Sequence, residues 1–138
     1  ELGRRRALAE AGESPVLNTS LDIYNYLRPR MSDLDHEEFW VVLLSGGCRV
    51  KGCERLFSGG WDGTMIDVRM LFRRVLESRA SAIVIAHNHP SGNLRPSPQD
   101  MALTKKVREA GKLLDINLLD HLIVCLGGYY SFADEGTL

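Results

Sequence analysis

Apolar residues along this chain follow two kinds of pattern, short continuous runs and runs with helical spacing. Residues 39–44 (FWVVLL) and 82–86 (AIVIA) are apolar at every position, which is typical of central strands covered on both faces. Residues 49–57 come after a Ser-Gly-Gly turn and predict the second strand of a hairpin. Three further short runs predict strands at residues 116–119, 122–126 and 129–132.

Three segments predict helices. The first begins at an N-cap residue, Ser20, and ends at Pro29. Asp67 caps the second, and Ser97 caps the third, where Asp100 completes a capping-box pattern. The apolar stripes expected to be buried are Leu21, Tyr24 and Leu27 in the first helix, Val68, Leu71, Phe72, Val75 and Leu76 in the second, and Leu103, Val107, Ala110 and Leu114 in the third.

The order of these elements predicts an α/β fold in which a layered, mixed β-sheet is flanked by helices. At 138 residues the chain has the length of one ordinary domain. Residues 1–12 hold too few apolar side chains to fold by themselves. We therefore interpret residues 1–17 as a linker or helical remnant of an upstream domain, and residues 18–138 as the domain itself.

The composition is that of a globular protein with no dominant charge. Seventeen basic residues face 18 acidic ones, so the overall charge predicts neither a nucleic-acid nor a membrane partner. The triplet at residues 4–6 (RRR) would suit phosphate groups, but we favour a solvated helix face. Three cysteines without Cys-x-x-Cys spacing, no long apolar segment and no signal peptide predict a cytoplasmic protein with free thiols.

Candidate chemistry lies at the end of the second apolar strand. His87 and His89 are two residues apart, so on a strand they point to the same face. After ten intervening residues comes Asp100, in the first turn of the third predicted helix. Two imidazoles and one carboxylate can hold a catalytic zinc ion and leave its fourth position open. The spacing alone leaves a second interpretation open, a polar strand end followed by a capped helix.

The sequence of this stretch resembles the signature of the RadC family, whose domain is of the JAMM (MPN+) metallopeptidase type. The resemblance rests on residues 87–93 (HNHPSGN), Pro96, Ser97 and Asp100, with support from residues 57–59 (FSG) and 119–121 (LDH). It covers most of the chain from Asp35 onward. Residues 1–5 resemble the junction that follows the helix-hairpin-helix domain of RadC proteins, a domain that this sequence does not include.

The resemblance implies a fold of the cytidine-deaminase-like, JAMM (MPN) type and a role for each matching residue. His87, His89 and Asp100 would hold one zinc ion per chain, and Ser97 would stabilise a developing oxyanion. An upstream glutamate would act as general base in the hydrolysis of a peptide or isopeptide bond. Glu37 and Glu38 both precede the first strand; we favour Glu37, and a register slip of one residue would select Glu38.

A second functional interpretation is a non-catalytic module that binds protein or DNA, because RadC proteins are associated with DNA repair. The complete ligand set favours the hydrolase. The resemblance names no substrate beyond a protein or peptide, and JAMM-type domains often associate, so a homo-oligomer is a further expectation. Asp120 and His121 would serve either as hydrogen-bond partners of the ligands or as a structural pair.

Overall fold

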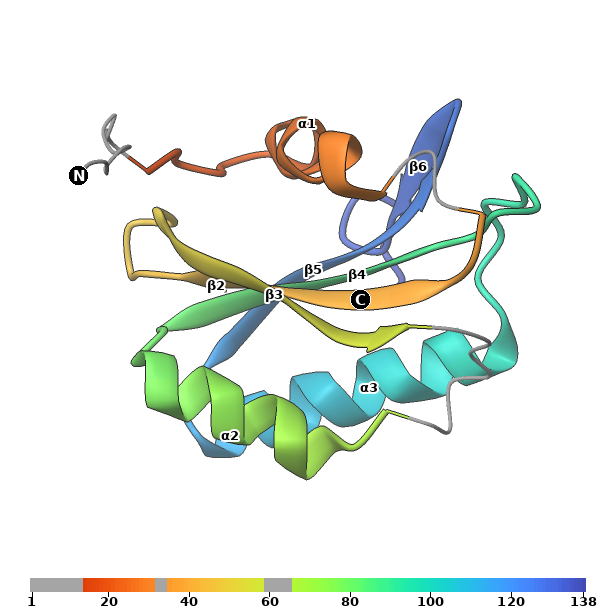
Figure 1. Ribbon diagram of the computed structural model, residues 1–138. Coiled ribbons are helices and arrows are strands. Elements are labelled where there is room, and N and C mark those ends of the chain that lie inside the picture. The colour runs from red at the N-terminus through yellow and green to blue at the C-terminus, as the bar shows by residue number, and fades with distance from the viewer. Residues whose placement is uncertain (1–13, 32–34, 59–65) are drawn as a thin grey trace.

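The computed structural model describes residues 14–31, 35–58 and 66–138. A five-stranded sheet of order β3-β2-β4-β5-β6 forms its middle layer. Helix α1 covers one face of the sheet, and α2 and α3 cover the other (Figure 1). The helices are α1 (Ser20–Met31), α2 (Val68–Ser78) and α3 (Pro98–Leu113), and the strands are β2 (Glu38–Leu44), β3 (Val50–Ser58), β4 (Ala82–Asn88), β5 (Asn117–Cys125) and β6 (Gly128–Ser131).

The sheet is mixed, as the sequence predicted. Strands β4 and β5 run parallel, and the other neighbouring pairs are antiparallel. The two continuous apolar runs became β2 and β4, which are neighbours in the middle of the sheet. The pairing of Phe39 with His87 sets the first histidine beside the start of β2.

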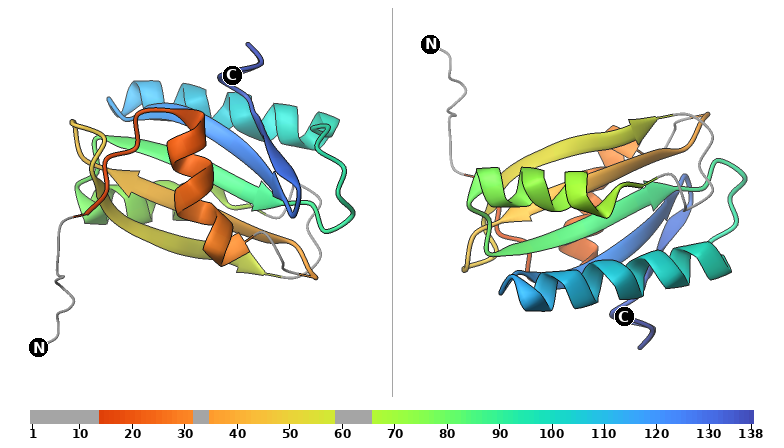
Figure 2. Two further views of the ribbon diagram at one scale, coloured as in Figure 1. Left: turned by 90° about the horizontal axis from the view of Figure 1, so that it is seen from above. Right: turned by 90° about the horizontal axis from the view of Figure 1, so that it is seen from below.

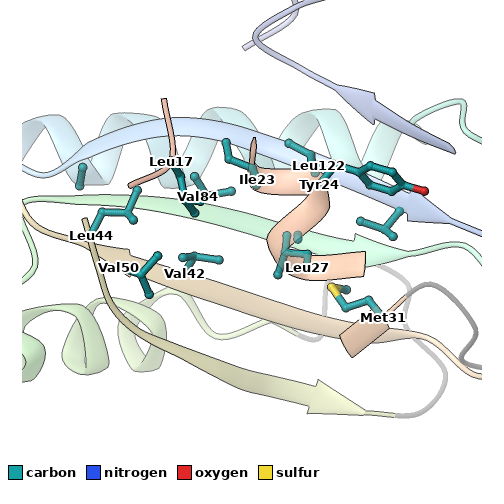
Figure 3. Close-up of a cluster of buried hydrophobic side chains, with 13 residues drawn as sticks. Leu17, Ile23, Tyr24, Leu27, Met31, Val42, Leu44, Val50, Val84 and Leu122 are labelled. Carbon is teal, nitrogen blue, oxygen red and sulfur yellow. The ribbon is translucent and has the colours of Figure 1, made fainter. Parts of the chain in front are cut away.

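Alternation along the strands divides the core into two clusters. Val42, Leu44 and Val84 lie on the α1 face, in one cluster with Leu17, Ile23 and Leu27 (Figure 3). The intervening residues of the same strands, such as Phe39, Val41 and Ile85, pack under α2 and α3. Figure 2 shows these two faces of the sheet in turn. The side of the sheet that a residue faces therefore follows from its position along the strand.

Local sequence signals placed all three helices, although some boundaries and exposures differ from the prediction. Helix α1 continues through Pro29 to Met31, and the side chain of Met31 is fully buried in the cluster between α1 and the sheet. Leu21, Leu76 and Leu114 were expected to be buried, but they are 54%, 53% and 44% exposed. Each lies at the margin of its apolar stripe, where packing decides which residue the sheet covers.

The predicted strands at 116–119 and 122–126 are one strand, β5. The polar pair Asp120 and His121 looks like an interruption, but both side chains are buried within β5. Their hydrogen bonds come from distant segments: Ser131 donates to Asp120, and His121 is bonded to Thr104. Tertiary partners thus keep two polar residues inside a central strand.

The predicted linker, residues 1–17, is described only in its last four residues. Of these, Leu17 is buried in the α1 cluster and Val16 forms a β-bridge with Arg49. The arginine triplet at 4–6 lies outside the described residues. Within the described ranges, none of the helices combines the length and the apolar character that crossing a membrane requires.

Candidate metal centre

Three potential metal ligands meet where β4 ends and α3 begins. The Nε2 atoms of His87 and His89 lie 3.0 Å apart. Asp100 places Oδ1 at 3.3 Å from the Nε2 atom of His87 and Oδ2 at 3.7 Å from that of His89. Ligands bound at about 2.0–2.1 Å to a tetrahedral ion lie roughly 3.3 Å from one another. The three side chains therefore fit a single ion of zinc-like size.

The strand and the helix cap hold these ligands by local rules. His87 lies in β4, and the backbone N–H of His89 donates to Val124 at 3.1 Å, so the strand geometry extends past the end of β4 and directs both rings to one face. Ser97 Oγ accepts from the backbone N–H of Asp100 at 3.1 Å, and Asp100 Oδ2 accepts from that of Ser97 at 2.7 Å. The predicted capping box is confirmed, and it fixes the carboxylate that faces the histidines.

The protonation states suit a metal site. Burial disfavours the charged form of Asp100, but its contacts with His87 and Ser97 outweigh this and lower its pKa to about 2. Burial lowers the pKa of His87. The Nδ1 atom of His89 lies 2.5 Å from the carbonyl oxygen of Asn93; because a carbonyl only accepts, Nδ1 carries a hydrogen, and Nε2 is the nitrogen that faces the cluster. An ionised carboxylate and neutral imidazoles are the forms that bind metal.

The side chain of Glu38 binds three neighbouring side chains and lies on the α1 face of the sheet. Its carboxylate accepts from Trp40 Nε1 at 2.9 Å, contacts His36 Nε2 at 2.7 Å and pairs with Arg55 at 3.5 Å. Although burial by itself raises the pKa of Glu38, the hydrogen bonds with His36 and Trp40 lower it overall. These contacts explain a buried carboxylate at this position without any metal.

Glu37 directly precedes β2 and is half-buried. Alternation extended one residue upstream of the strand assigns it to the face of Phe39 and His87. The backbone on both sides of Glu37 is held by one buried amide, that of Asn88. Its Nδ2 donates to the carbonyl of His36, and its Oδ1 accepts from the N–H of Glu38, both at 2.7 Å.

Other candidate residues divide into neighbours of the site and structural residues. His121 contacts the first histidine directly, with its Nε2 atom 2.9 Å from His87 Nδ1. Asp120 instead binds Ser131 and the backbone N–H of Ala133, which fits a structural carboxylate. Ser91 accepts from the N–H of Asn93, as expected for turn chemistry.

Two residues at the site were missed in the sequence, Asn88 and Thr104. Asn88 was passed over as the spacer between the two histidines. Thr104 is the one hydroxyl among the buried residues of α3 that face the sheet, and it lies one helical turn after Asp100. A polar side chain at a position that the apolar stripe should occupy was the signal that could have found it.

A cavity of about 620 Å³ opens beside His89. Its volume lies in the range of small-molecule and peptide side-chain sites. Apolar side chains and glycines form most of its wall, and Asp35 lies among them. The lining residues are Asp35, Asn88, His89, Pro90, Gly92, Leu94, Val124, Cys125, Leu126, Gly127 and Gly128.

The mixed sheet with helices on both faces and the His-His-Asp cluster at a strand end define a domain of the JAB (JAMM, MPN) class. The sequence profile of the RadC-like JAB domain matches residues 17–137. The chain belongs to this family.

Relatives named "UPF0758 protein" cover nearly the whole chain. The one from Flavobacterium johnsoniae is 43% identical over 136 residues, which are 99% of this chain and 59% of the relative. The one from Porphyromonas gingivalis is 43% identical over 139 residues, 100% of this chain and 61% of the relative. The chain thus spans about three fifths of the length of these curated relatives, and the name of these relatives states no activity.

Proposed function

We propose that this domain is a zinc-dependent hydrolase that cleaves a peptide or isopeptide bond. The observation that carries the proposal is the convergence of His87, His89 and Asp100 at tetrahedral ligand spacing; of these three, His89 also lines the cavity. A structural zinc site normally has four protein ligands, whereas a catalytic site has three and leaves one position to water. The described cluster offers three.

The bound ion would supply Lewis acidity, which lowers the pKa of a coordinated water and polarises a carbonyl group. We assign the general base to Glu37, which would take a proton from the attacking water and return it to the leaving amine. Strand alternation supports this choice, because Glu38 faces away from the ligands and binds Trp40 and His36.

Ser97 has a geometry that supports a role in the reaction. Its Oγ atom accepts from the N–H of Asp100, so its position is set by the helix cap that also sets a metal ligand. Its own hydroxyl hydrogen is then available for a developing oxyanion. A preorganised donor of this kind is typically worth about 10²–10³-fold in rate.

The first test is metal content. The chain purified without chelator should hold about one zinc ion per molecule, and His89→Ala should lose it, since two ligands bind zinc far more weakly than three. No zinc uptake at micromolar concentrations by the unmodified chain would refute the proposed site. The alternative occupants, other divalent ions, are distinguished by elemental analysis of the same samples.

The second test separates the two glutamates. Incubation with fluorogenic peptide and lysine-isopeptide libraries should give hydrolysis that disappears in Glu37→Gln while zinc is retained. Glu38→Gln is the matched control, and should lower stability but keep hydrolysis. The reverse pattern would move the base to Glu38. Zinc binding without hydrolysis of any library member would favour the binding module, for which salt-dependent binding to DNA is the corresponding assay.

A further inference from the structure

A chain of three buried hydrogen bonds connects one metal ligand to the backbone of another. Thr104 Oγ1 lies 2.7 Å from the carbonyl oxygen of Asp100 and 2.6 Å from His121 Nδ1. On its other side, His121 Nε2 lies 2.9 Å from His87 Nδ1. The side chains of Thr104, His121 and His87 are almost wholly buried, so water does not compete with these bonds.

The chemistry of the atoms sets the direction of every bond. The carbonyl of Asp100 only accepts, and a hydroxyl has a single hydrogen, so Thr104 donates that hydrogen to Asp100. Thr104 must then accept from His121 Nδ1–H. The ring of His121 is fully buried, and its two nitrogens contact Thr104 and His87, neither of which is a carboxylate that could balance a charge. The ring is therefore neutral and its Nε2 accepts. His87 Nδ1 therefore carries a hydrogen, which leaves Nε2 as the nitrogen that can bind an ion.

That result selects the nitrogen that faces the other ligands. His87 Nε2 is the atom 3.0 Å from His89 Nε2 and 3.3 Å from Asp100 Oδ1. With the opposite tautomer, an N–H group would point into the cluster and would have to leave before an ion could bind. The ring of His121 is itself held by Phe132, on which it stacks at a centroid distance of 4.5 Å and an interplanar angle of 4°.

We infer that Thr104 and His121 are positioning residues, which hold His87 in the tautomer and orientation that bind the metal through Nε2. This inference rests on the proposed function only in its last step, the binding of zinc. Thr104 acts on two ligands at once, since the hydroxyl that orients His121 also binds the backbone of Asp100. Hydrogen-bond partners of metal ligands typically change metal affinity by about 10–100-fold when removed.

The test compares zinc affinities measured by chelator competition on the 138-residue chain. Thr104→Val keeps the side-chain shape but removes the hydroxyl, and should weaken zinc binding about 10–100-fold. Thr104→Ser restores the hydroxyl and should return the affinity toward that of the unmodified chain. Ser131→Ala is the matched control, because it removes a buried hydroxyl that binds Asp120 rather than the His121 chain; its zinc affinity should not change.

A second measurement reads the tautomers without any metal or activity. In ¹⁵N-labelled, metal-free protein, two-bond nitrogen–hydrogen correlations should show both His87 and His121 with the hydrogen on Nδ1. A His87 ring without a hydrogen on Nδ1 in the unmodified chain would overturn the inference, as would wild-type zinc affinity in folded Thr104→Val. If the unmodified chain binds no zinc, the proposed function fails, while the tautomer measurement still decides the inference. The same measurement decides it if Thr104→Val does not fold.

Discussion

Substitution of Asn88 by alanine tests whether the residue between the two histidines positions the general base. The amide of Asn88 makes hydrogen bonds of 2.7 Å to the carbonyl of His36 and to the N–H of Glu38. Glu37 lies between these two backbone groups. Asn88→Ala removes both bonds and leaves the metal ligands in place, because the side chain of Asn88 points to the opposite side of β4 from His87.

The expected effects follow from the two bonds. A buried backbone group that loses its partner costs about 1–3 kcal/mol, and a second hydrogen bond contributes about 1 kcal/mol. The free energy of unfolding should therefore fall by about 2–4 kcal/mol, as measured by urea denaturation. A displacement of the base by about 1 Å can cost about 10²-fold in rate. Hydrolysis should fall by about that factor while zinc affinity stays close to that of the unmodified chain.

Two variants separate positioning from a loss of stability. Asn88→Asp keeps an acceptor for the Glu38 N–H but cannot donate to His36 when ionised. Its rate of hydrolysis should lie between that of the unmodified chain and that of Asn88→Ala. Gly111→Ala destabilises the fold at a distance from Glu37, and should leave the rate unchanged below its melting temperature. Unaltered hydrolysis in folded Asn88→Ala would refute the positioning role. An equal loss of zinc affinity would show that Asn88 acts on the ligands.

Other predictions concern packing, thiol chemistry and metal linkage. Gly111→Ala should lower the free energy of unfolding by about 1–3 kcal/mol, because the added Cβ would lie 2.4 Å from the Ile116 carbonyl oxygen; a gain of about 1 kcal/mol, usual for glycine to alanine in an exposed helix, would contradict this contact. Burial raises the pKa of Cys53 to about 11, so at pH 8 only about one thiol in a thousand is ionised. The Cys53 thiol should therefore be alkylated slowly, as followed by peptide mass spectrometry. Rapid alkylation in folded protein would contradict its burial. Zinc at a hundred times its Kd should stabilise the chain by about 2.7 kcal/mol; an unchanged melting temperature after chelation would argue against a bound ion in the purified protein.

Local chemistry explains which parts of the site could be predicted from sequence. Ser97 and Asp100 form a helix cap whose geometry depends on four consecutive residues, so the sequence carried the whole signal. The histidine pair at the end of β4 is equally local, since alternation along one strand sets both rings on one side. The continuous apolar runs predicted the two central strands for the same reason.

Contacts between distant segments explain what sequence patterns missed. Asp120 and His121 indicated a break because they are polar residues within an apolar run, whereas Ser131 and Thr104 bind their side chains across the fold. The exposure of Leu21 likewise depends on how α1 lies on the sheet, which its own periodicity does not specify. These features are set by the packing of whole elements and require the tertiary structure.

Successive side chains at the end of β4 point to opposite sides of the sheet, which gives the middle residue of the His-Asn-His motif a role different from that of the two histidines. His87 and His89 face α3 and meet Asp100 there, whereas Asn88 faces the other way and holds the backbone of His36 and Glu38. A single strand end therefore supplies two of the three candidate metal ligands, and its remaining side chain holds the backbone around the proposed base. Because adjacent strand residues cannot change sides independently, the spacing between ligands and base is built into the pairing of β4 with β2.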